Sequence, residues 1–291
     1  MKKTDQMKIT DSDLSPVYDT TGSGIARFRQ MVLDHYRDHG REMPWRENTE
    51  PYHILVSEIM LQQTQVERVT GIFPGFIAAF PDFGTLAEAP LPSVLSAWQG
   101  LGYNRRAIAL QQCAARVMAE FGGVLPDDPS ILATFPGIGH ATASSICAFA
   151  FNQPVIFIET NIRRVFIHYF FSDSASVSDN ELIPLVERAL PAENSRIWYW
   201  ALMDLGTVLK KTVANPNRRS VHYTKQSAFA GSDRKIRGEI LRLLLDGNEK
   251  FTEKIIAAFP EEDPARMERI ISGLERDGFI VRSGDCIRLA S

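Results

Sequence analysis

The sequence is poor in cysteine, in long apolar runs and in excess charge of either sign. Its three cysteines, Cys113, Cys147 and Cys286, are scattered over 291 residues and form no CxxC pair. This spacing excludes a disulfide framework and the usual zinc sites. Charge or proline interrupts every apolar run before it reaches the roughly 18 residues of a membrane-spanning helix. We therefore expect no bound metal and no membrane contact.

The overall composition is that of a globular protein, with 44% hydrophobic and 23% charged residues. Such a composition excludes a wholly disordered or collagen-like chain, and the length predicts one or two domains. The net charge of −3 by itself disfavours nucleic acid as a partner. Residues 1–15 are polar and charged and show no signal-peptide pattern, so we expect a cytoplasmic protein.

Residues 25–210 carry the periodicity of helices. Apolar residues recur at helical spacing over 25–39, 52–70, 91–99 and 106–121, which predicts four helices. Pro74, Pro81, Pro90 and Pro92 are typical of short connections between helices. One extended stretch is expected over 154–158. The region is therefore predicted to be almost entirely helical.

The chain changes character near residue 210. Between Lys210 and Arg242 there are nine basic residues and two acidic ones, so nine minus two gives a net charge of +7. Such a segment is either a solvated linker or an arm that contacts phosphates. Helical patterns over 236–245, 251–259 and 265–276 follow, and then two short strands over 279–282 and 286–289. Three helices and a terminal hairpin indicate a small winged-helix-like domain.

A glycine-containing turn between two helical patterns points to a DNA-backbone site. Pro136-Gly137-Ile138-Gly139 is followed by His140, Thr142 and an apolar helix. Glycines allow the backbone to approach a ligand closely, and the free amides at the start of a helix bind phosphate. The alternative is a tight turn between helices with no ligand. With its flanking helices the segment indicates a helix-hairpin-helix.

Two carboxylates stand where apolar segments make them unusual. Glu58 lies inside a helix that is apolar over most of its circumference, where desolvation favours the protonated form that a general acid needs. Glu159 ends the apolar stretch 154–158 and leads into a helix, for which Thr160 or Asn161 is the expected N-cap. A second carboxylate suits glycosidic-bond cleavage, because it stabilises a cationic sugar. Each residue also has a purely structural interpretation. Glu58 would then be a surface residue of an amphipathic helix, and Glu159 a negative charge that complements the dipole at the start of a helix.

Several segments together resemble the MutY-type adenine DNA glycosylases of the helix-hairpin-helix superfamily. They are Pro44-Trp45-Arg46 with Pro51-Tyr52, Ser57 to Val66, Trp98 to Tyr103, Pro136 to Ala143, and Met203-Asp204-Leu205-Gly206. They occur in the family's order and cover about residues 25–210. The resemblance implies a mainly α fold of two helical lobes with a DNA cleft between them. It also implies the substrate class of that family, double-stranded DNA with a mismatched or damaged base.

The resemblance assigns roles to individual residues. Glu58 matches the acid that protonates the departing base, and Glu159 stands where the family has a catalytic aspartate. Trp45, Arg46 and Trp200 are expected at the base pocket. The remaining candidates are expected to contact DNA: Gln62, Gln63, Tyr103, Gly137, Gly139, His140, Thr142, Arg163, Lys210, Lys211, Arg218 and Arg219.

Ala141 stands where lyase relatives carry a Schiff-base lysine, and a methyl group forms no imine. The sequence departs from the family at four places, of which Glu159 in place of the aspartate is the first. Trp200 replaces the pocket glutamine, which predicts looser reading of the base. The four closely spaced cysteines of an iron–sulfur cluster are absent after Gly206, so no cluster is expected. A winged-helix-like domain takes the place of the usual Nudix-like domain.

These observations predict a monofunctional, monomeric DNA glycosylase of base excision repair, without cofactor and associated with the nucleoid. Adenine opposite guanine or 8-oxoguanine is the expected target. Two alternatives remain: a thymine or uracil mismatch glycosylase, and a non-catalytic DNA-binding protein with the same fold. The expected organisation is a flexible leader (1–22), the glycosylase domain (23–209), a basic connecting segment (210–235) and the winged-helix-like domain (236–291).

Overall fold

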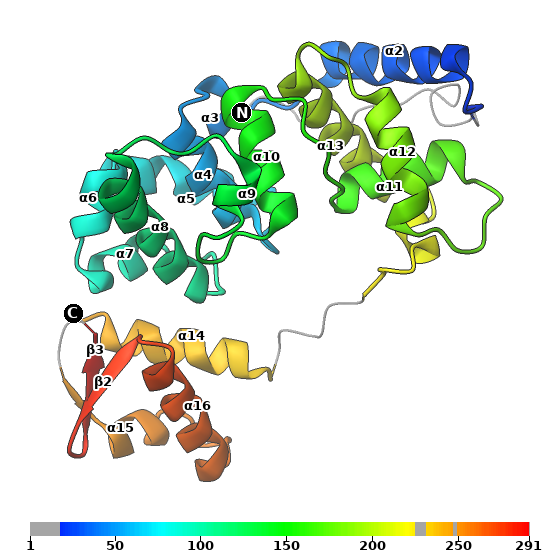
Figure 1. Cartoon of the computed structure of the whole chain (residues 1–291). Helices are drawn as coiled ribbons and strands as arrows, with labels where there is room; N and C mark the ends of the chain where they lie inside the picture. Colours follow the sequence, from blue (N-terminus) through cyan, green and yellow to red (C-terminus); the bar gives the residue numbers. More distant parts are fainter. Residues whose placement is uncertain (1–17, 225–230, 247–248, 291) are drawn as a thin grey trace, which may run out of the picture. The chain divides into compact units, whose positions relative to one another are not determined.

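The computed structural model describes residues 18–224, 231–246 and 249–290, and helices dominate all of them (Figure 1). This confirms the mainly α fold. Contacts divide the described residues into two compact units, one of residues 18–54, 127–133 and 139–224, the other of 55–126, 134–138, 231–246 and 249–290. Within the described ranges, every helix is too short or too polar to cross a membrane.

The first unit is built around three packed helices. Its elements are α2 (Gly22–His39), α3 (Pro44–Glu47), α9 (Pro129–Leu132), α10 (His140–Phe151), α11 (Thr160–Phe170), α12 (Asp179–Ala189), α13 (Ser195–Thr212) and the 3-10 turn η1 (Pro216–Arg219). Helix α13 packs against both α11 and α2. Phe28 of α2 lies at the centre, fully buried, with the rings of Phe166 and Trp198 at 5.3 and 6.0 Å. This core fixes the direction of α11, whose first turn follows Glu159.

The second unit contains a helical part and a small C-terminal part. Helix α4 (Pro51–Leu61) enters it at residue 55 and is followed by α5 (Val66–Ala79), α6 (Phe83–Glu88), α7 (Leu91–Ala97) and α8 (Arg105–Phe121). The C-terminal part comprises α14 (Asp233–Leu244), β1 (Lys250–Phe251), α15 (Thr252–Ala257), α16 (Pro264–Arg276), β2 (Ile280–Ser283) and β3 (Cys286–Leu289). Its antiparallel sheet has the order β1-β3-β2, the arrangement of a winged helix.

Glycines end several helices where the sequence places them. The amide of Gly40 caps α2 by donating to the carbonyl oxygen of Tyr36, and Gly122, at φ 59°, ends α8. Gly284, at φ 60°, turns the β2–β3 hairpin. A left-handed φ is inexpensive for glycine, so the ends at Gly122 and Gly284 can be predicted from the local sequence.

Three expectations about secondary structure were wrong. The helix expected over 52–70 is interrupted between Leu61 and Val66, where Gln63 adopts a left-handed φ of 56°. Pro74 lies inside α5 instead of in a connection, because packing of the helix offsets the hydrogen bond that proline cannot make. Strand β1, which pairs Phe251 with Cys286, takes the first residue of the helix expected over 251–259.

Parts of the expected organisation lie outside the described residues. They include residues 1–17 of the leader and Lys225 of the basic segment. Tyr18 is described, and it packs on the first unit: its amide donates to the carbonyl oxygen of Tyr169 at 2.9 Å and its ring lies 5.6 Å from that of Phe28. Residues 154–158 form neither a helix nor a ladder-paired strand.

Candidate active site

Glu58 projects from a helix whose neighbouring side chains are buried. Leu55, Val56 and Ile59 are at most 1% exposed, and Ser57 is fully buried, whereas Glu58 is half-buried. The carboxyl group is thus held at the edge of an apolar helix, as its position in the sequence predicts. The Glu58 side chain is thus partly shielded from water by its apolar neighbours.

Arg106 of α8 holds the end of the Glu58 helix. Its Nη1 donates to the carbonyl oxygens of Ile59, Met60 and Gln62 at 2.8, 2.7 and 2.6 Å. These are carbonyl groups at the C-terminus of α4, which lack partners within the helix and attract positive charge. Burial lowers the pKa of the Arg106 guanidinium to about 10, so it stays charged at neutral pH.

The same guanidinium fixes the Gly102–Tyr103 loop. Nη2 of Arg106 donates to the carbonyl oxygen of Gly102 at 3.0 Å and to Oγ1 of Thr64 at 2.9 Å. Tyr103 itself has a left-handed φ of 47°, and its ring lies 5.5 Å from the Arg106 guanidinium. Arg234 of α14 also stacks on this ring at 5.2 Å and donates to the hydroxyl. Arg106 thus connects the C-terminal end of α4, the glutamine turn and Tyr103, and no pattern in the sequence marked it for this role.

The glutamine turn contacts the glycine hairpin. Nε2 of Gln62 donates to the carbonyl oxygen of Gly137 at 3.0 Å, whereas Gln63 is exposed. Gly137 has a φ of 73°, and a Cβ there would lie 3.0 Å from Cβ of Ala109. Glycine is therefore required at 137 both by its backbone conformation and by its neighbour. The structure brings together Gln62 and Gly137, two residues that the sequence assigns to DNA binding.

Gly139 begins α10 as its N-cap and leaves the first turn accessible. His140 and Ala141 are exposed, and Thr142 is half-exposed. A Cβ at Gly139 would meet no atom within 4 Å, so the space above this turn is open to a ligand. The free amides of a helix N-terminus are suited to binding a phosphate.

Glu159 is the N-cap of α11, which corrects the expectation that Thr160 or Asn161 fills that position. Its Oε1 accepts hydrogen bonds from the amides of Asn161 and Ile162 at 2.6 and 2.9 Å. Burial raises the pKa of the Glu159 carboxyl, and the amide hydrogen bonds and nearby Arg164 and Arg163 offset this only in part. The capping hydrogen bonds fix the position of the carboxylate.

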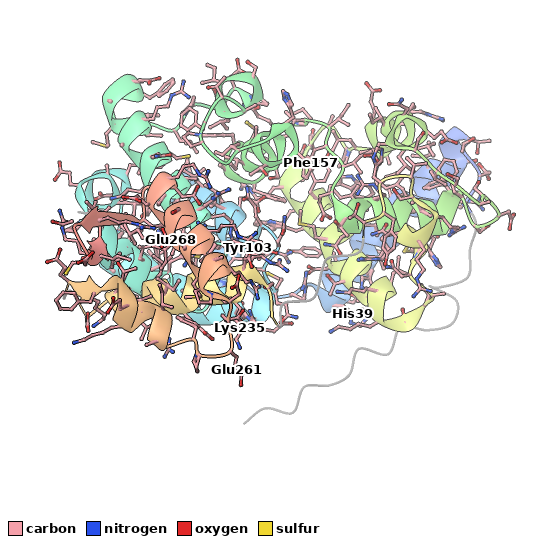
Figure 2. All side chains as sticks on the ribbon, turned by 90° about the horizontal axis from the view of Figure 1, so that it is seen from below. His39, Tyr103, Phe157, Lys235, Glu261 and Glu268 are labelled. Atoms are coloured by element: carbon pink, nitrogen blue, oxygen red, sulfur yellow. The ribbon has the colours of Figure 1, made fainter. Side chains whose placement is uncertain are left out.

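The segment that leads to Glu159 is anchored by aromatic packing. Phe157, labelled in Figure 2, is 5% exposed, and its ring lies 4.2 Å from that of Tyr199. On the other side of Glu159, a Cβ on Gly206 would lie 2.6 Å from Cβ of Asn161. Helices α11 and α13 therefore approach as closely as glycine permits, which explains the glycine of the Met-Asp-Leu-Gly sequence.

The residues expected at the base pocket form an ion-pair and aromatic cluster. Arg46 donates to both carboxylate oxygens of Asp204 at 2.9 Å, and Arg41 lies 2.6 Å from the same group. Burial raises the pKa of Asp204, but the two arginines outweigh it and keep the pKa below its usual value. Trp200 is 6% exposed, stacks on Phe149 and has the Arg46 guanidinium 5.2 Å from its ring.

Trp45, the third pocket residue, is also buried, at 4% exposure. Within the first unit, Arg46 is hydrogen-bonded to Asp204, and Trp200 stacks on Phe149. The sequence named Asp204 only as part of a similar segment. Its role as the shared partner of two arginines is visible only in the fold.

The basic residues expected to contact DNA fall into two groups. Lys210, Lys211 and Arg218 are exposed. The other two are engaged within the first unit. Arg163 forms two hydrogen bonds of 2.7 Å with Asp179, and Arg219 donates to the carbonyl oxygens of Phe171 and Ser172.

The cysteines do not fit an iron–sulfur cluster. The thiols of Cys113 and Cys147 donate to the carbonyl oxygens of Pro136 and Asp127, each at 3.3 Å. Burial raises the pKa of both thiols to about 12, which opposes the thiolate form that a metal requires. Cys286 lies in β3, and among the described residues no group of three or more His, Cys, Asp or Glu side chains is placed to hold a metal ion.

Comparisons with known proteins agree with this geometry. Residues 56–185 match the HhH-GPD superfamily base excision DNA repair protein family. An adenine DNA glycosylase of Mycolicibacterium smegmatis is 33% identical over 273 residues, which cover 87% of this chain and 92% of the relative. A human adenine DNA glycosylase is 32% identical over 206 residues, which cover 67% of this chain and 37% of that protein.

Solved structures show the same fold. A thermostable thymine-DNA glycosylase is similar with a TM-score of 0.58 and 25% identity, over 65% of this chain and 89% of that one. An endonuclease III trapped on DNA is similar with a TM-score of 0.54 and 20% identity, over 64% and 85% of the two chains.

The family match and these relatives make the chain a base excision DNA glycosylase, a hydrolase that binds DNA and cleaves the N-glycosidic bond. More narrowly, the chain belongs to the HhH-GPD superfamily and, within it, to the MutY-type adenine DNA glycosylase family. This excludes the alternative of a non-catalytic DNA-binding protein.

Proposed function

We propose that the enzyme removes adenine mispaired with guanine or 8-oxoguanine. The observation that carries this proposal is the Glu58 helix, whose sequence resembles the adenine-removing branch and whose carboxyl group lies half-buried beside apolar neighbours. Relatives that bear the name adenine DNA glycosylase match 87% of the chain. The enzyme acts as a monomer on duplex DNA, and in the cell it works at the nucleoid.

In the proposed reaction, the target nucleotide leaves the base stack before the chemistry begins. Glu58 gives its proton to a ring nitrogen of adenine, and the bond between the base and the sugar C1′ breaks with its electron pair leaving on the base. The ionised Glu159 stabilises the cationic sugar. A water oxygen then bonds to C1′, and Glu159 accepts the proton that the water releases. The products are free adenine and an abasic site.

We propose that the enzyme lacks lyase activity. The support is Ala141, which stands on the exposed first turn of α10 and has no amine to attack the sugar. Reduction of a reaction mixture with borohydride should trap no covalent complex between enzyme and DNA. Efficient trapping would identify another amine as nucleophile and overturn this part of the proposal.

Thymine or uracil opposite guanine is a second candidate target. It is favoured by the similarity to a thermostable thymine-DNA glycosylase over 89% of that chain. It is also favoured by Trp200, which gives the expected pocket position an indole in place of an amide that would hydrogen-bond a base edge. Adenine remains the first choice because the sequence relatives cover more of the chain.

Single-turnover time courses on four duplexes test the proposal. The duplexes carry A·G, A·8-oxoguanine, T·G and U·G pairs in the same flanking sequence. We expect adenine release from the first two at similar rates, because no Nudix-like domain resembling that of the family is expected from the sequence. Activity confined to T·G and U·G would overturn the adenine assignment and leave the enzyme a DNA glycosylase.

A further inference from the structure

A short segment after α13 follows the Glu159 helix and contacts both of its ends. The segment, Asn215–Ser220, contains η1 and packs against α11. At the N-terminal end, Nδ2 of Asn217 donates to the carbonyl oxygen of Thr160 at 2.9 Å. At the C-terminal end, Arg219 donates to the carbonyl oxygens of Phe171 and Ser172. We refer to this segment as the strap.

The contact at the N-terminal end is buried and directly adjoins the capping residue. Asn217 is 5% exposed, and Thr160 is the residue after Glu159. Without this bond the amide donor of Asn217 would be buried without a partner, which costs free energy. The bond to Thr160 therefore ties the backbone of the first helical turn to the strap.

Asn215 and Arg164 complete the connection. Oδ1 of Asn215 accepts from the amide of Asn217 at 3.2 Å and from Nε of Arg164 at 3.4 Å. Nη1 of Arg164, a residue 3% exposed, donates to Oδ1 of Asn161 and to the carbonyl oxygen of Gly206, both at 2.7 Å. The first turn of α11 is thus held from the strap and from α13 together.

The far end of the strap is fixed independently. The amide of Val177 donates to the carbonyl oxygen of Arg219 at 2.8 Å, and the amide of Val221 donates to the carbonyl oxygen of Val177 at 3.1 Å. This parallel bridge between Val177 and Ser220 anchors the strap beyond the end of α11. Because both ends are held, Asn217 cannot shift along the helix without breaking several hydrogen bonds.

We propose that the strap positions the Glu159 carboxylate for base excision, with Asn217 as the positioning residue. An N-cap carboxylate lies where the first-turn amides place it, here those of Asn161 and Ile162. If the first turn frays, these amides move and the carboxylate moves with them. A displacement of about 1 Å can cost on the order of 100-fold in rate. This inference rests on the proposed catalytic role of Glu159.

The test compares Asn217→Ala, Glu159→Gln and the double variant with Asn180→Ala, an exposed asparagine of α12. Single-turnover excision is measured with saturating enzyme on an A·G duplex, together with the duplex Kd. We expect Asn217→Ala to lower the rate roughly 10- to 100-fold with an unchanged Kd. In the double variant, Asn217→Ala should lower the excision rate little below that of Glu159→Gln alone, because both changes act through the same carboxylate. Asn180→Ala should match the wild type.

Amide hydrogen exchange provides a readout that is independent of activity. Exchange at Asn161 and Ile162 should accelerate in Asn217→Ala and stay unchanged in Asn180→Ala. If a folded Asn217→Ala protein shows unchanged exchange and an unchanged excision rate, the proposed positioning role of the strap is wrong. A near wild-type rate in Glu159→Gln, with faster exchange in Asn217→Ala, would instead reject the catalytic role of Glu159 and leave the strap as a purely structural device.

Asn217→Asp covers the case in which the alanine variant does not fold. It keeps the size of the side chain but replaces the donor to Thr160 with an oxygen and adds a negative charge beside the first turn of α11. Loss of the donor should accelerate exchange at Asn161 and Ile162 and lower the excision rate, as expected for the alanine variant. Wild-type exchange together with a wild-type rate in this variant would contradict the proposal.

Discussion

Arg106 donates a hydrogen bond of 2.8 Å to the carbonyl oxygen of Ile59, the residue that follows Glu58. Further bonds from the same guanidinium reach the glutamine turn and the loop before Tyr103. No carboxylate is among its hydrogen-bond acceptors within the described residues. A single buried cation, balanced by carbonyl dipoles, therefore connects the segments that carry four of the candidate site residues, Glu58, Gln62, Gln63 and Tyr103.

Arg106→Lys should destabilise the protein. An ammonium group presents three donors and no planar fork, so it cannot serve the carbonyl groups of Ile59, Met60 and Gly102 together. Loss of such charge-assisted bonds costs about 1.5–3 kcal/mol each, and the melting temperature should fall by several degrees. Arg105→Lys is the matched control, because Arg105 is 72% exposed and its pair with Asp277 contributes little. Equal melting temperatures for the two variants would contradict this account.

Glu58→Gln should abolish base release and leave DNA binding intact. The amide keeps the shape of the side chain but has no acidic proton to give, and general acid catalysis contributes roughly 10²–10⁴-fold. Single-turnover excision and duplex Kd measure the two properties separately. If the glutamine variant excises at the wild-type rate, another group supplies the proton.

The pH dependence of excision should reveal the raised pKa of Glu159. The carboxylate must be ionised to stabilise the sugar cation, so activity is present above its pKa in the folded protein and is lost as pH falls through it. Because burial raises this pKa above the usual 4.5, the acidic limb should lie at higher pH than an ordinary glutamate gives. The rate profile of Glu159→Gln should lack this limb, whereas Glu159→Asp should retain one. A limb that persists in the glutamine variant would assign it to another group.

Charge reversal at Arg218 should weaken binding to all duplexes alike. Each phosphate contact that is lost should make the salt dependence of log K shallower by about 0.9. Arg27→Glu changes the net charge equally on an exposed surface of α2 and should leave the slope unaltered. Arg219 is bonded to backbone carbonyls, so its replacement should act mainly on stability. An unaltered slope in the Arg218 variant would make that residue part of a solvated linker.

The purified protein should fold without iron. Neither buried thiol is poised to ionise, since burial raises the pKa of Cys113 and Cys147 to about 12. We expect no visible absorbance from a thiolate-ligated cluster and no effect of iron chelators on the melting temperature. Stoichiometric iron and sulfide in anaerobically purified protein would refute this expectation.

Much of the site is visible in local sequence, but the capping of α11 is not. The sequence marks Glu159 because an apolar stretch ends there, and it offers Thr160 and Asn161 as conventional caps. The structure makes Glu159 itself the cap. Glutamate is not among the residues usually preferred as an N-cap. The close packing of Gly206 on Asn161, which places Asn161 inside the first turn of α11, is a tertiary contact that the sequence does not reveal.

The sequence by itself determined the features that depend on neighbours along the chain. Helical spacing placed Glu58 on an apolar helix, and glycine marked the hairpin at Gly137 and the end of α8, because periodicity and left-handed φ are local properties. Tertiary structure alone decided the break after Leu61 and the division of the arginines into exposed and engaged groups. Those outcomes depend on partners far away in sequence: Arg106 reaches the carbonyl group of Ile59 across 47 positions and Arg219 reaches that of Phe171 across 48. An arginine is held by the hydrogen-bond acceptors that folding brings close to it, and these acceptors cannot be predicted from the neighbouring residues in the sequence.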